Sequence, residues 1–229
     1  FRSGLALLAL SALLTVQSTG TPVLLTSEPL ALWLTLPVLV VYPMLFAWLS
    51  HRTAIRLAEH KRRLELMSTR DGMTGVFNRR HWETLLRNEF DACRRSHRQA
   101  TILLIDIDHF KTINDTWGHD VGDEAIVAIT RQLQLTLRSG DYIGRFGGDE
   151  FAVIMSGTPA DSAIAAMSRV HERLVNMPLH GAPTARLCIS VGVAPWGAQF
   201  THYREWLKAA DVALYKAKNA GRGRTEVAA

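Results

Sequence analysis

The stretch Arg145-Phe146-Gly147-Gly148-Asp149-Glu150-Phe151 lies between two runs of strand-forming residues, 141–146 and 151–155. Two adjacent glycines can supply the positive φ angles of a tight hairpin. We therefore predict a β-hairpin with Asp149 and Glu150 at its tip, where paired carboxylates can hold a hard metal ion. A plain surface turn of the same sequence is the alternative, and the rest of the chain decides between the two.

Charge is unevenly distributed along the 229 residues. Among residues 1–49 only Arg2 and Glu28 are charged, so residues 50–229 carry nearly all of the 26 basic and 21 acidic side chains. The two cysteines, Cys93 and Cys188, lie far apart, one in a helical and one in a strand pattern. This spacing indicates free thiols in a reducing compartment, with neither a disulfide framework nor a cysteine metal site.

Residues 30–49 are an uncharged run of 20 residues, LALWLTLPVLVVYPMLFAWL. That length suits an α-helix that crosses the hydrocarbon core of a membrane, and proline is tolerated in such helices. We predict a transmembrane helix here, with a buried core helix or hairpin as the alternative, and a candidate second helix over about 3–20. Because the chain begins at Phe1 instead of Met, we expect residues 1–49 to be the end of a longer membrane region.

The segment 50–70 is basic and helical in composition, with six Lys or Arg residues against two Glu. By the positive-inside rule this excess places the domain that follows in the cytoplasm. Apolar residues recur at intervals of three and four, but Lys61 interrupts this thin coiled-coil seam. Two compatible interpretations stay open: a signalling helix that pairs two chains, or a solvated basic stalk near anionic lipid.

Residues 71–229 read as one soluble domain of alternating helices and strands. We predict helices over 79–97, 110–117, 121–138, 160–176 and 202–219, and strands over 100–107, 141–146, 151–155, 186–194 and 225–228. The run 100–107 is almost wholly apolar, as in a central strand buried on both faces. Because the hairpin excludes an all-parallel sheet, we expect an α/β (α+β) fold with a mixed, largely antiparallel sheet flanked by helices.

Two carboxylates, Asp106 and Asp108, mark the end of the apolar strand. Charged groups are unfavourable there unless they are paired or bind metal. If this strand lies beside the hairpin, Asp106 and Asp149 converge, and with a backbone carbonyl they form an oxygen cage for two Mg²⁺ ions that clamps nucleotide phosphates. Phe110 and Lys111 then open a helix whose first amide groups can cradle a phosphate.

Six ordered motifs over roughly residues 68–226 resemble the GGDEF family of diguanylate cyclases. They are Asp71-x-Met73-Thr74-Gly75-x-x-Asn78-Arg79-Arg80, Asp106-x-Asp108-x-Phe110-Lys111-x-x-Asn114-Asp115, Gly118-His119, Gly122-Asp123, Gly147 to Phe151, and Tyr215-Lys216-Ala217-Lys218-x-x-Gly221-Arg222. The resemblance implies a nucleotidyl-cyclase or palm-like fold that condenses two GTP into cyclic di-GMP and two pyrophosphates. Together with the predicted membrane helices and the basic segment 50–70, it leads us to expect a multi-pass protein of the bacterial inner membrane with its catalytic domain in the cytoplasm.

The resemblance assigns roles to individual residues. Two Mg²⁺ ions, which Mn²⁺ can replace, would be held by the side chains of Asp106, Asp149 and Glu150 and by the carbonyl of Ile107. Substrate would be contacted by Asn114 and Asp123 at the guanine edge, by Phe110, Lys111 and His119 beside it, and by Lys218 and Arg222 at the terminal phosphates. Asp149 or Glu150 would deprotonate the attacking ribose 3′-hydroxyl.

Two further expectations concern assembly and control. Because two GTP molecules must meet, the resemblance implies a homodimer in which each subunit supplies half a site. Arg138-Ser139-Gly140-Asp141 matches the family's Arg-x-x-Asp motif and implies feedback inhibition by cyclic di-GMP, with a helix end and turn as the alternative. The function alternatives are an inactive receptor for cyclic di-GMP or GTP and another two-metal nucleotidyl transferase, and no nucleic-acid partner is expected.

Overall fold

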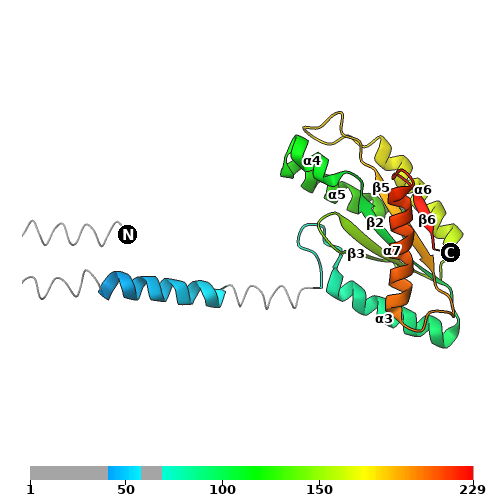
Figure 1. Ribbon diagram of the computed structural model, residues 1–229, viewed down its shortest axis with the longest axis horizontal. Helices are drawn as coiled ribbons and strands as arrows, with labels where there is room; N and C mark the ends of the chain where they lie inside the picture. The colour runs from blue at the N-terminus through cyan, green and yellow to red at the C-terminus, as the bar shows by residue number, and fades with distance from the viewer. Residues whose placement is uncertain (1–40, 58–68, 229) are drawn as a thin grey trace, which may run out of the picture. The chain divides into compact units, whose positions relative to one another are not determined.

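The chain divides into two units, Phe1–Leu64 and Glu65–Ala229. The computed structural model describes residues 41–57 of the first and 69–228 of the second (Figure 1). Residues 41–57 are helical with exposed apolar side chains, Trp48 among them. No helix within the described ranges is long and apolar enough to cross a membrane. The transmembrane helix predicted over 30–49 falls only partly on these ranges, and the candidate over 3–20 lies outside them, so both stay predictions.

The second unit is built on a six-stranded sheet in the order β1-β3-β4-β2-β5-β6. The strands are β1 (Phe77–Asn78), β2 (Ala100–Ile107), β3 (Tyr142–Arg145), β4 (Glu150–Ser156), β5 (Ile189–Pro195) and β6 (Thr225–Val227). The central strand β2 pairs antiparallel with β4 and with β5, and β3 pairs antiparallel with β4. Only the short edge strands β1 and β6 pair in parallel with their neighbours. The predicted mixed, largely antiparallel sheet is confirmed.

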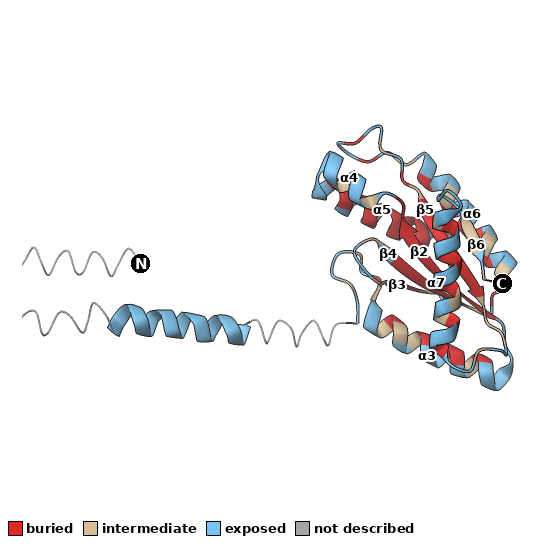
Figure 2. Cartoon of the chain, in the orientation of Figure 1, coloured by how far each residue is buried: buried red, intermediate tan, exposed pale blue. Residues whose placement is uncertain are grey.

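Five helices cover the two faces of this sheet (Figure 1). They are α3 (Arg79–Ser96), α4 (Phe110–Trp117), α5 (His119–Thr136), α6 (Ala160–Val175) and α7 (Tyr203–Asn219). Successive residues of β2 face opposite sides: Leu103 and Ile105 pack with α5 and α6, whereas Ile102 and Leu104 pack with α3 and α7. Figure 2 shows the result, buried strands between helices whose outer faces are exposed.

Two details of the packing place the elements that carry the site. Trp82 and Trp206 are fully buried and donate their indole N–H groups to the carbonyls of Tyr142 and Ala194. A buried aromatic side chain of this size stabilises a fold by roughly 3 kcal/mol. On β5, a Cβ at Gly192 would overlap the backbone of α7 at Ala210 and Leu214, so glycine lets that helix lie directly on the sheet.

The predictions agree with the structure to within one residue at each end of an element, except in four places. The helix predicted over 121–138 runs from His119 to Thr136, the strand predicted from 186 begins at Ile189, and β1 was not predicted at all. Asn78 caps the N-terminus of α3, because its Oδ1 accepts from the amide of His81 at 3.0 Å.

The fourth difference concerns the hairpin glycines. Neither Gly147 nor Gly148 has a positive φ, so the conformational reason given for them is wrong. The loop between β3 and β4 spans four residues, and loops of that length are built around turns that do not need positive φ angles. Space favours glycine at only one of the two positions: a Cβ at Gly147 would lie 3.0 Å from Glu150 Oε2, whereas a Cβ at Gly148 would meet nothing within 4 Å.

Candidate active site

The end of β2 and the hairpin lie side by side, as the sequence predicts. Asp106 pairs in register with Glu150, and the amide of Ile107 donates to the carbonyl of Asp149 at 3.2 Å. Asp106 is 8% exposed, Asp149 is half-buried and Glu150 is exposed. The pairing of β2 with β4 therefore brings the predicted acidic residues together at one end of these central strands.

The carboxylate of Asp106 is buried and lies near two other acidic side chains, Asp149 and Asp108. Burial raises its pKa, the neighbouring charges of Asp149 and Asp108 raise it further, and Lys218 opposes the rise without cancelling it. The Nζ of Lys218 lies 2.7 Å from Asp106 Oδ2. The sequence places Lys218 at the terminal phosphates, whereas in the structure its partner is Asp106. The ammonium of Lys218 thus lies against a buried carboxylate that has two other carboxylates near it. Such a position favours a cation.

The donor atoms at this edge fit Mg²⁺ in kind. The side chains of Asp106 and Asp149 and the carbonyl of Ile107 offer only oxygen, the ligand that hard divalent cations prefer. Within residues 41–57 and 69–228, no group of three His, Cys, Asp or Glu side chains is arranged to hold a metal ion. The protein thus offers part of a coordination shell, and Mg²⁺ usually completes such a shell with water and substrate phosphates.

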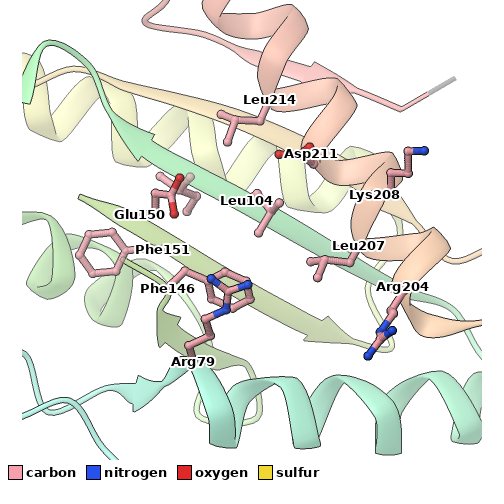
Figure 3. A pocket seen from close by; sticks show the side chains of 11 residues that line it. Arg79, Leu104, Phe146, Glu150, Phe151, Arg204, Leu207, Lys208, Asp211 and Leu214 are labelled. Carbon is pink, nitrogen blue, oxygen red and sulfur yellow. The ribbon is translucent and has the colours of Figure 1, made fainter. Parts of the chain in front are cut away.

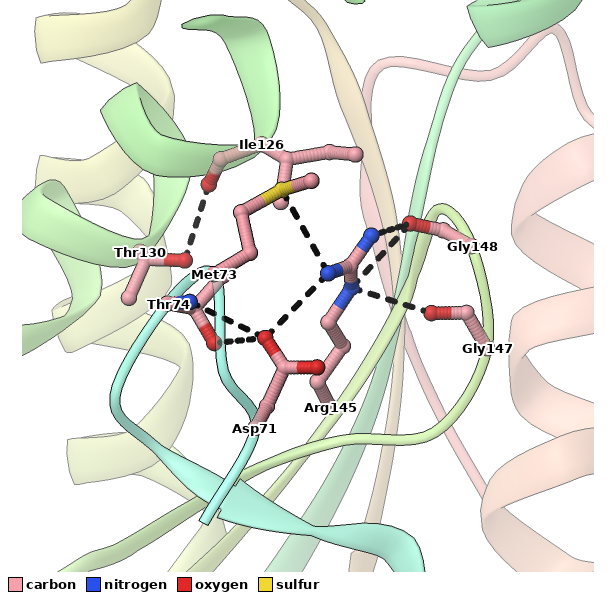
Figure 4. A network of polar contacts seen from close by, with 8 residues as sticks. All are labelled: Asp71, Met73, Thr74, Ile126, Thr130, Arg145, Gly147 and Gly148. Carbon is pink, nitrogen blue, oxygen red and sulfur yellow. Dashed lines mark hydrogen bonds and ion pairs between the residues drawn. The ribbon is translucent and has the colours of Figure 1, made fainter. Parts of the chain in front are cut away.

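The hairpin is held by Arg145, which the sequence analysis did not single out (Figure 4). Its guanidinium donates to the carbonyls of Gly148 at 2.8 Å and Gly147 at 3.1 Å. The same group lies 3.2 Å from Asp71 Oδ1, with the two side chains 12% and 25% exposed. Arg145 therefore ties the β3–β4 hairpin to the first turn of the domain, residues 71–75.

Asp71 organises that first turn. Its Oδ1 accepts from the amide of Thr74 at 2.9 Å and from the Thr74 hydroxyl at 2.7 Å. Burial works against ionisation of Asp71, but the hydrogen bonds from Thr74 and Arg145 outweigh it and lower its pKa below the ordinary value. Asp71 thus holds the turn at the start of the domain, and its contact with Arg145 extends that role to the hairpin.

Asp108 directly follows the end of β2, two residues after Asp106. It is 4% exposed, and its two oxygens accept from Ser190 Oγ at 2.7 Å and from the amide of Gly223 at 2.9 Å. Asp108 does not cap α4, because His109 occupies the N-cap of that helix with a φ of 57°. Asp108 thus fastens the turn after α7 to the sheet, at the end of the helix whose Lys218 contacts Asp106.

The remaining predicted substrate residues gather at the corner between α4 and α5. Phe110 begins α4, His119 begins α5, and Asp123 lies one turn into α5. Lys111, His119 and Asp123 are exposed, whereas Phe110 and Asn114 are half-buried. Asn114 Oδ1 is buried and is one of two such side-chain atoms without a hydrogen-bond partner in the described part of the chain. An unsatisfied polar atom at a cluster of polar groups is a feature of ligand sites.

The predicted inhibitory pair forms a compact turn after α5. The amide of Arg138 donates to Asp141 Oδ2 at 2.9 Å, and the amide of Asp141 donates to the carbonyl of Arg138 at 3.0 Å. Burial raises the pKa of Asp141, with Arg138 opposing the rise. These bonds are those of the turn that was the alternative, and they leave the side chain of Arg138 exposed.

A pocket of about 310 Å³ lies beside the hairpin on the face covered by α3 and α7 (Figure 3). Its walls combine Leu104, Leu207 and Leu214 with Arg204, Lys208 and Asp211, and the guanidinium of Arg79 lies 4.9 Å from the centre of the Phe146 ring at its edge. Of the predicted site residues only Glu150 lines it. The predicted chemistry therefore lies at the open end of the sheet, outside this pocket.

Comparisons with known proteins agree with this geometry. The family model described as diguanylate cyclase, GGDEF domain, matches residues 68–224. The chain is 69% identical over 229 residues to the probable diguanylate cyclase DgcC of Escherichia coli strain K12, and spans 62% of that protein's length.

Two solved structures share the fold. The GGDEF domain of DgcB from Caulobacter crescentus in complex with c-di-GMP is 27% identical, with a TM-score of 0.67 over 70% of this chain and 96% of that one. The GGDEF domain of PA1120 (TpbB or YfiN) from Pseudomonas aeruginosa is 30% identical, with a TM-score of 0.65 over 70% of this chain and 94% of that one.

Proposed function

Because the chain belongs to the family of diguanylate cyclase GGDEF domains, we propose that it condenses two GTP molecules into cyclic di-GMP and two pyrophosphates. The observation that carries the proposal is the pairing of β2 with β4, which sets the buried Asp106 beside Asp149 and Glu150. Lys218, 2.7 Å from Asp106, adds a cation at the same edge. An anionic triphosphate needs this combination of metal-binding oxygens and a basic side chain.

Different residues near the end of β2 would bind the metal ions and the phosphates of the triphosphate. Asp106, Asp149, Glu150 and the carbonyl of Ile107 would hold two Mg²⁺ ions, or Mn²⁺ in their place. When bound, such ions neutralise phosphate charge and stabilise the attacking and leaving oxygens. Lys218 and Arg222 would turn to the terminal phosphates, where ammonium and guanidinium groups donate charge-assisted hydrogen bonds.

The chemical step joins two nucleotides. The 3′-oxygen of one GTP attacks the α-phosphorus of the other, a new P–O bond forms, and the bond to the β-phosphate oxygen breaks to release pyrophosphate. Asp149 or Glu150 would accept the proton of the 3′-hydroxyl. Repeating the step with the roles exchanged closes the ring and releases the second pyrophosphate.

One chain of this geometry can hold one GTP, so the reaction requires a homodimer with two hairpins facing each other. The basic segment 50–70 is a suitable pairing element, and residues 50–57 of it are helical. We place the domain on the cytoplasmic side of the bacterial inner membrane, anchored by the apolar segment 30–49. The membrane layout also suggests a likeness to the enterobacterial cyclase AdrA. A relative that matches the whole chain is named DgcC, however, and the proposal relies on that match.

Feedback inhibition by cyclic di-GMP through Arg138 and Asp141 belongs to the same proposal. The exposed guanidinium of Arg138 can bind a phosphate or a guanine edge with two parallel hydrogen bonds. That the DgcB domain was solved with c-di-GMP supports a product site in a similar fold. The variant Arg138→Ala should lose inhibition by added cyclic di-GMP, and unchanged inhibition would refute this part.

The central experiment incubates the purified chain with GTP and Mg²⁺ and separates the products by chromatography. We expect cyclic di-GMP, its loss in Asp149→Ala, and normal turnover in a control that removes an exposed carboxylate on α3, Asp91→Ala. GTP binding without product by a preparation shown to be dimeric would refute the cyclase activity and leave a nucleotide receptor.

A further inference from the structure

Gly122 lies at a position where glycine is unfavourable for the helix that contains it. It is buried inside the first turns of α5, with the φ of an ordinary helical residue. Glycine in such a position weakens a helix relative to alanine. Because no positive φ requires glycine here, the reason must lie in what surrounds it.

The surrounding group is the side-chain amide of Asn114 from α4. A Cβ at Gly122 would overlap Asn114 Oδ1, lie 3.0 Å from Asn114 Cγ, and lie 3.3 Å from Phe110 Cζ. The carbonyl end of the amide therefore rests directly on the Cα of Gly122. This contact buries Asn114 Oδ1 without a hydrogen-bond partner, an unfavourable arrangement that needs a compensating use.

The orientation of Asn114 decides which hydrogen-bonding group it offers to a ligand. With Oδ1 turned toward α5, the amide nitrogen is the end that keeps access to solvent, because it is not among the buried atoms without a partner. The exposed carboxylate of Asp123 follows Gly122 directly on α5. The corner between α4 and α5 thus presents one donor, from Asn114, and one acceptor, from Asp123.

This donor and acceptor complement guanine and conflict with adenine. Guanine offers the O6 acceptor beside the N1–H and N2–H donors, whereas adenine offers the N6–H donor beside the N1 acceptor. A reversed Asn114 amide would offer its oxygen at the same place and remove the match to O6.

We propose that Gly122 is a specificity-determining positioning residue: its missing side chain leaves room for the Asn114 amide against α5, with Oδ1 inward and the nitrogen toward the base, and the site so formed selects guanine over adenine. The inference rests on the proposed function and deepens it. It concerns Gly122 of α5, which lies against the side chain of Asn114. The presence of Asn114 and Asp123 alone would not lead to this inference.

The test is Gly122→Ala in the full chain, with kcat and KM for GTP measured separately. A methyl group displaces the Asn114 amide, so KM should rise about tenfold, the change that corresponds to loss of one hydrogen bond of about 1.4 kcal/mol. The preference of binding for GTP over ATP should fall by a similar factor, while kcat changes by less than about threefold. The melting temperature should stay the same or rise, because alanine is the better helix former.

A double-mutant cycle separates positioning from general damage. In an Asn114→Ala background there is no amide to displace, so adding Gly122→Ala should leave KM unchanged within about twofold. Independent, multiplying effects of the two substitutions would overturn the proposal, as would a Gly122→Ala protein with wild-type KM and nucleotide preference. Val127→Ala, at an exposed position of the same helix, is the matched control and should behave as wild type.

Failure of this inference can be told from failure of the proposed function by measuring equilibrium binding of a non-hydrolysable GTP analogue. A wild-type chain that binds the analogue but makes no product refutes the cyclase and leaves the Gly122 comparison measurable. Unchanged analogue binding by Gly122→Ala in an active enzyme refutes the inference alone.

Discussion

Replacing Arg145 with alanine should disconnect the β3–β4 hairpin from the first turn of the domain. The guanidinium makes hydrogen bonds to the carbonyls of Gly147 and Gly148 and an ion pair with Asp71 (Figure 4). No other side-chain contact to these two carbonyls occurs within the described ranges. The tip that carries Asp149 and Glu150 would then be held by its two strands and by the hydrogen bond from the amide of Ile107 to the carbonyl of Asp149.

The contacts allow an estimate of the loss in stability. The glycine carbonyls are exposed and regain water, so each hydrogen bond contributes at the low end, about 0.5 kcal/mol. The ion pair is mostly buried, but Asp71 keeps its bonds from Thr74, so its loss costs about 2 kcal/mol. The total is about 3 kcal/mol, which lowers the melting temperature of a domain of this size by roughly 6–12 °C.

The expected effect on catalysis is larger than the effect on folding. A displacement of about 1 Å in a reacting group can cost about 100-fold in rate, so Arg145→Ala should lower kcat/KM for GTP by about 100-fold. Arg145→Lys should be intermediate, because one ammonium cannot reproduce the fork that reaches two carbonyls. Asp71→Asn keeps the carbonyl bonds and should cost about tenfold or less.

The assay measures initial rates of cyclic di-GMP formation at temperatures well below the melting transition of each variant. Arg131→Ala, an exposed arginine on α5, is the matched control and should match wild type in rate and melting temperature. An Arg145→Ala rate within about twofold of wild type would show that the hairpin does not depend on this arginine. The reasoning would then be refuted even if the melting temperature fell.

Two further predictions follow from single contacts. Lys218→Met leaves the buried Asp106 without its cation, so the metal-free chain should lose about 1–2 kcal/mol, less than for a fully buried pair because Lys218 is 32% exposed. Mg²⁺ should then raise its melting temperature more than that of wild type, and an equal rise would count against a shared cation position. The pKa of His180 is raised by its hydrogen bond to Glu124, so this contact stabilises the chain below the ordinary pKa and the contribution is lost as pH rises through the raised value. An NMR titration should find the His180 midpoint above about 6.5 in wild type and closer to that value in Glu124→Gln; identical midpoints would contradict the assignment.

The order of elements was predictable because it depends on local patterns. The apolar run 100–107 specifies a strand buried on both faces, and the spacing of apolar residues in 121–138 and 160–176 specifies helices with one buried side. The acidic strand end at Asp106 and the hairpin at Gly147 indicated a site in the same way. Each of these signals lies within about twenty residues, so no knowledge of the fold is needed to read it.

The conformation of the hairpin could not be predicted this way. A Gly-Gly pair permits positive φ angles but does not require them, and the four-residue loop between β3 and β4 adopts others. At Gly147 a Cβ would lie 3.0 Å from Glu150 Oε2, a contact that depends on where the fold places the Glu150 side chain.

Sequence alone determined that an acidic strand end, a glycine hairpin and a basic C-terminal helix occur in one domain of a recognisable family. Only the tertiary structure decided how they are held: Arg145 by Asp71, Lys218 by Asp106, and Gly223 by Asp108. These partners lie 74, 112 and 115 residues apart. Local periodicity carries no information over such distances, because the contacts arise when strand pairing and helix packing bring the ends of the sheet together. The orientation of the Asn114 amide on Gly122 arises in the same way, from two helices that meet at a corner.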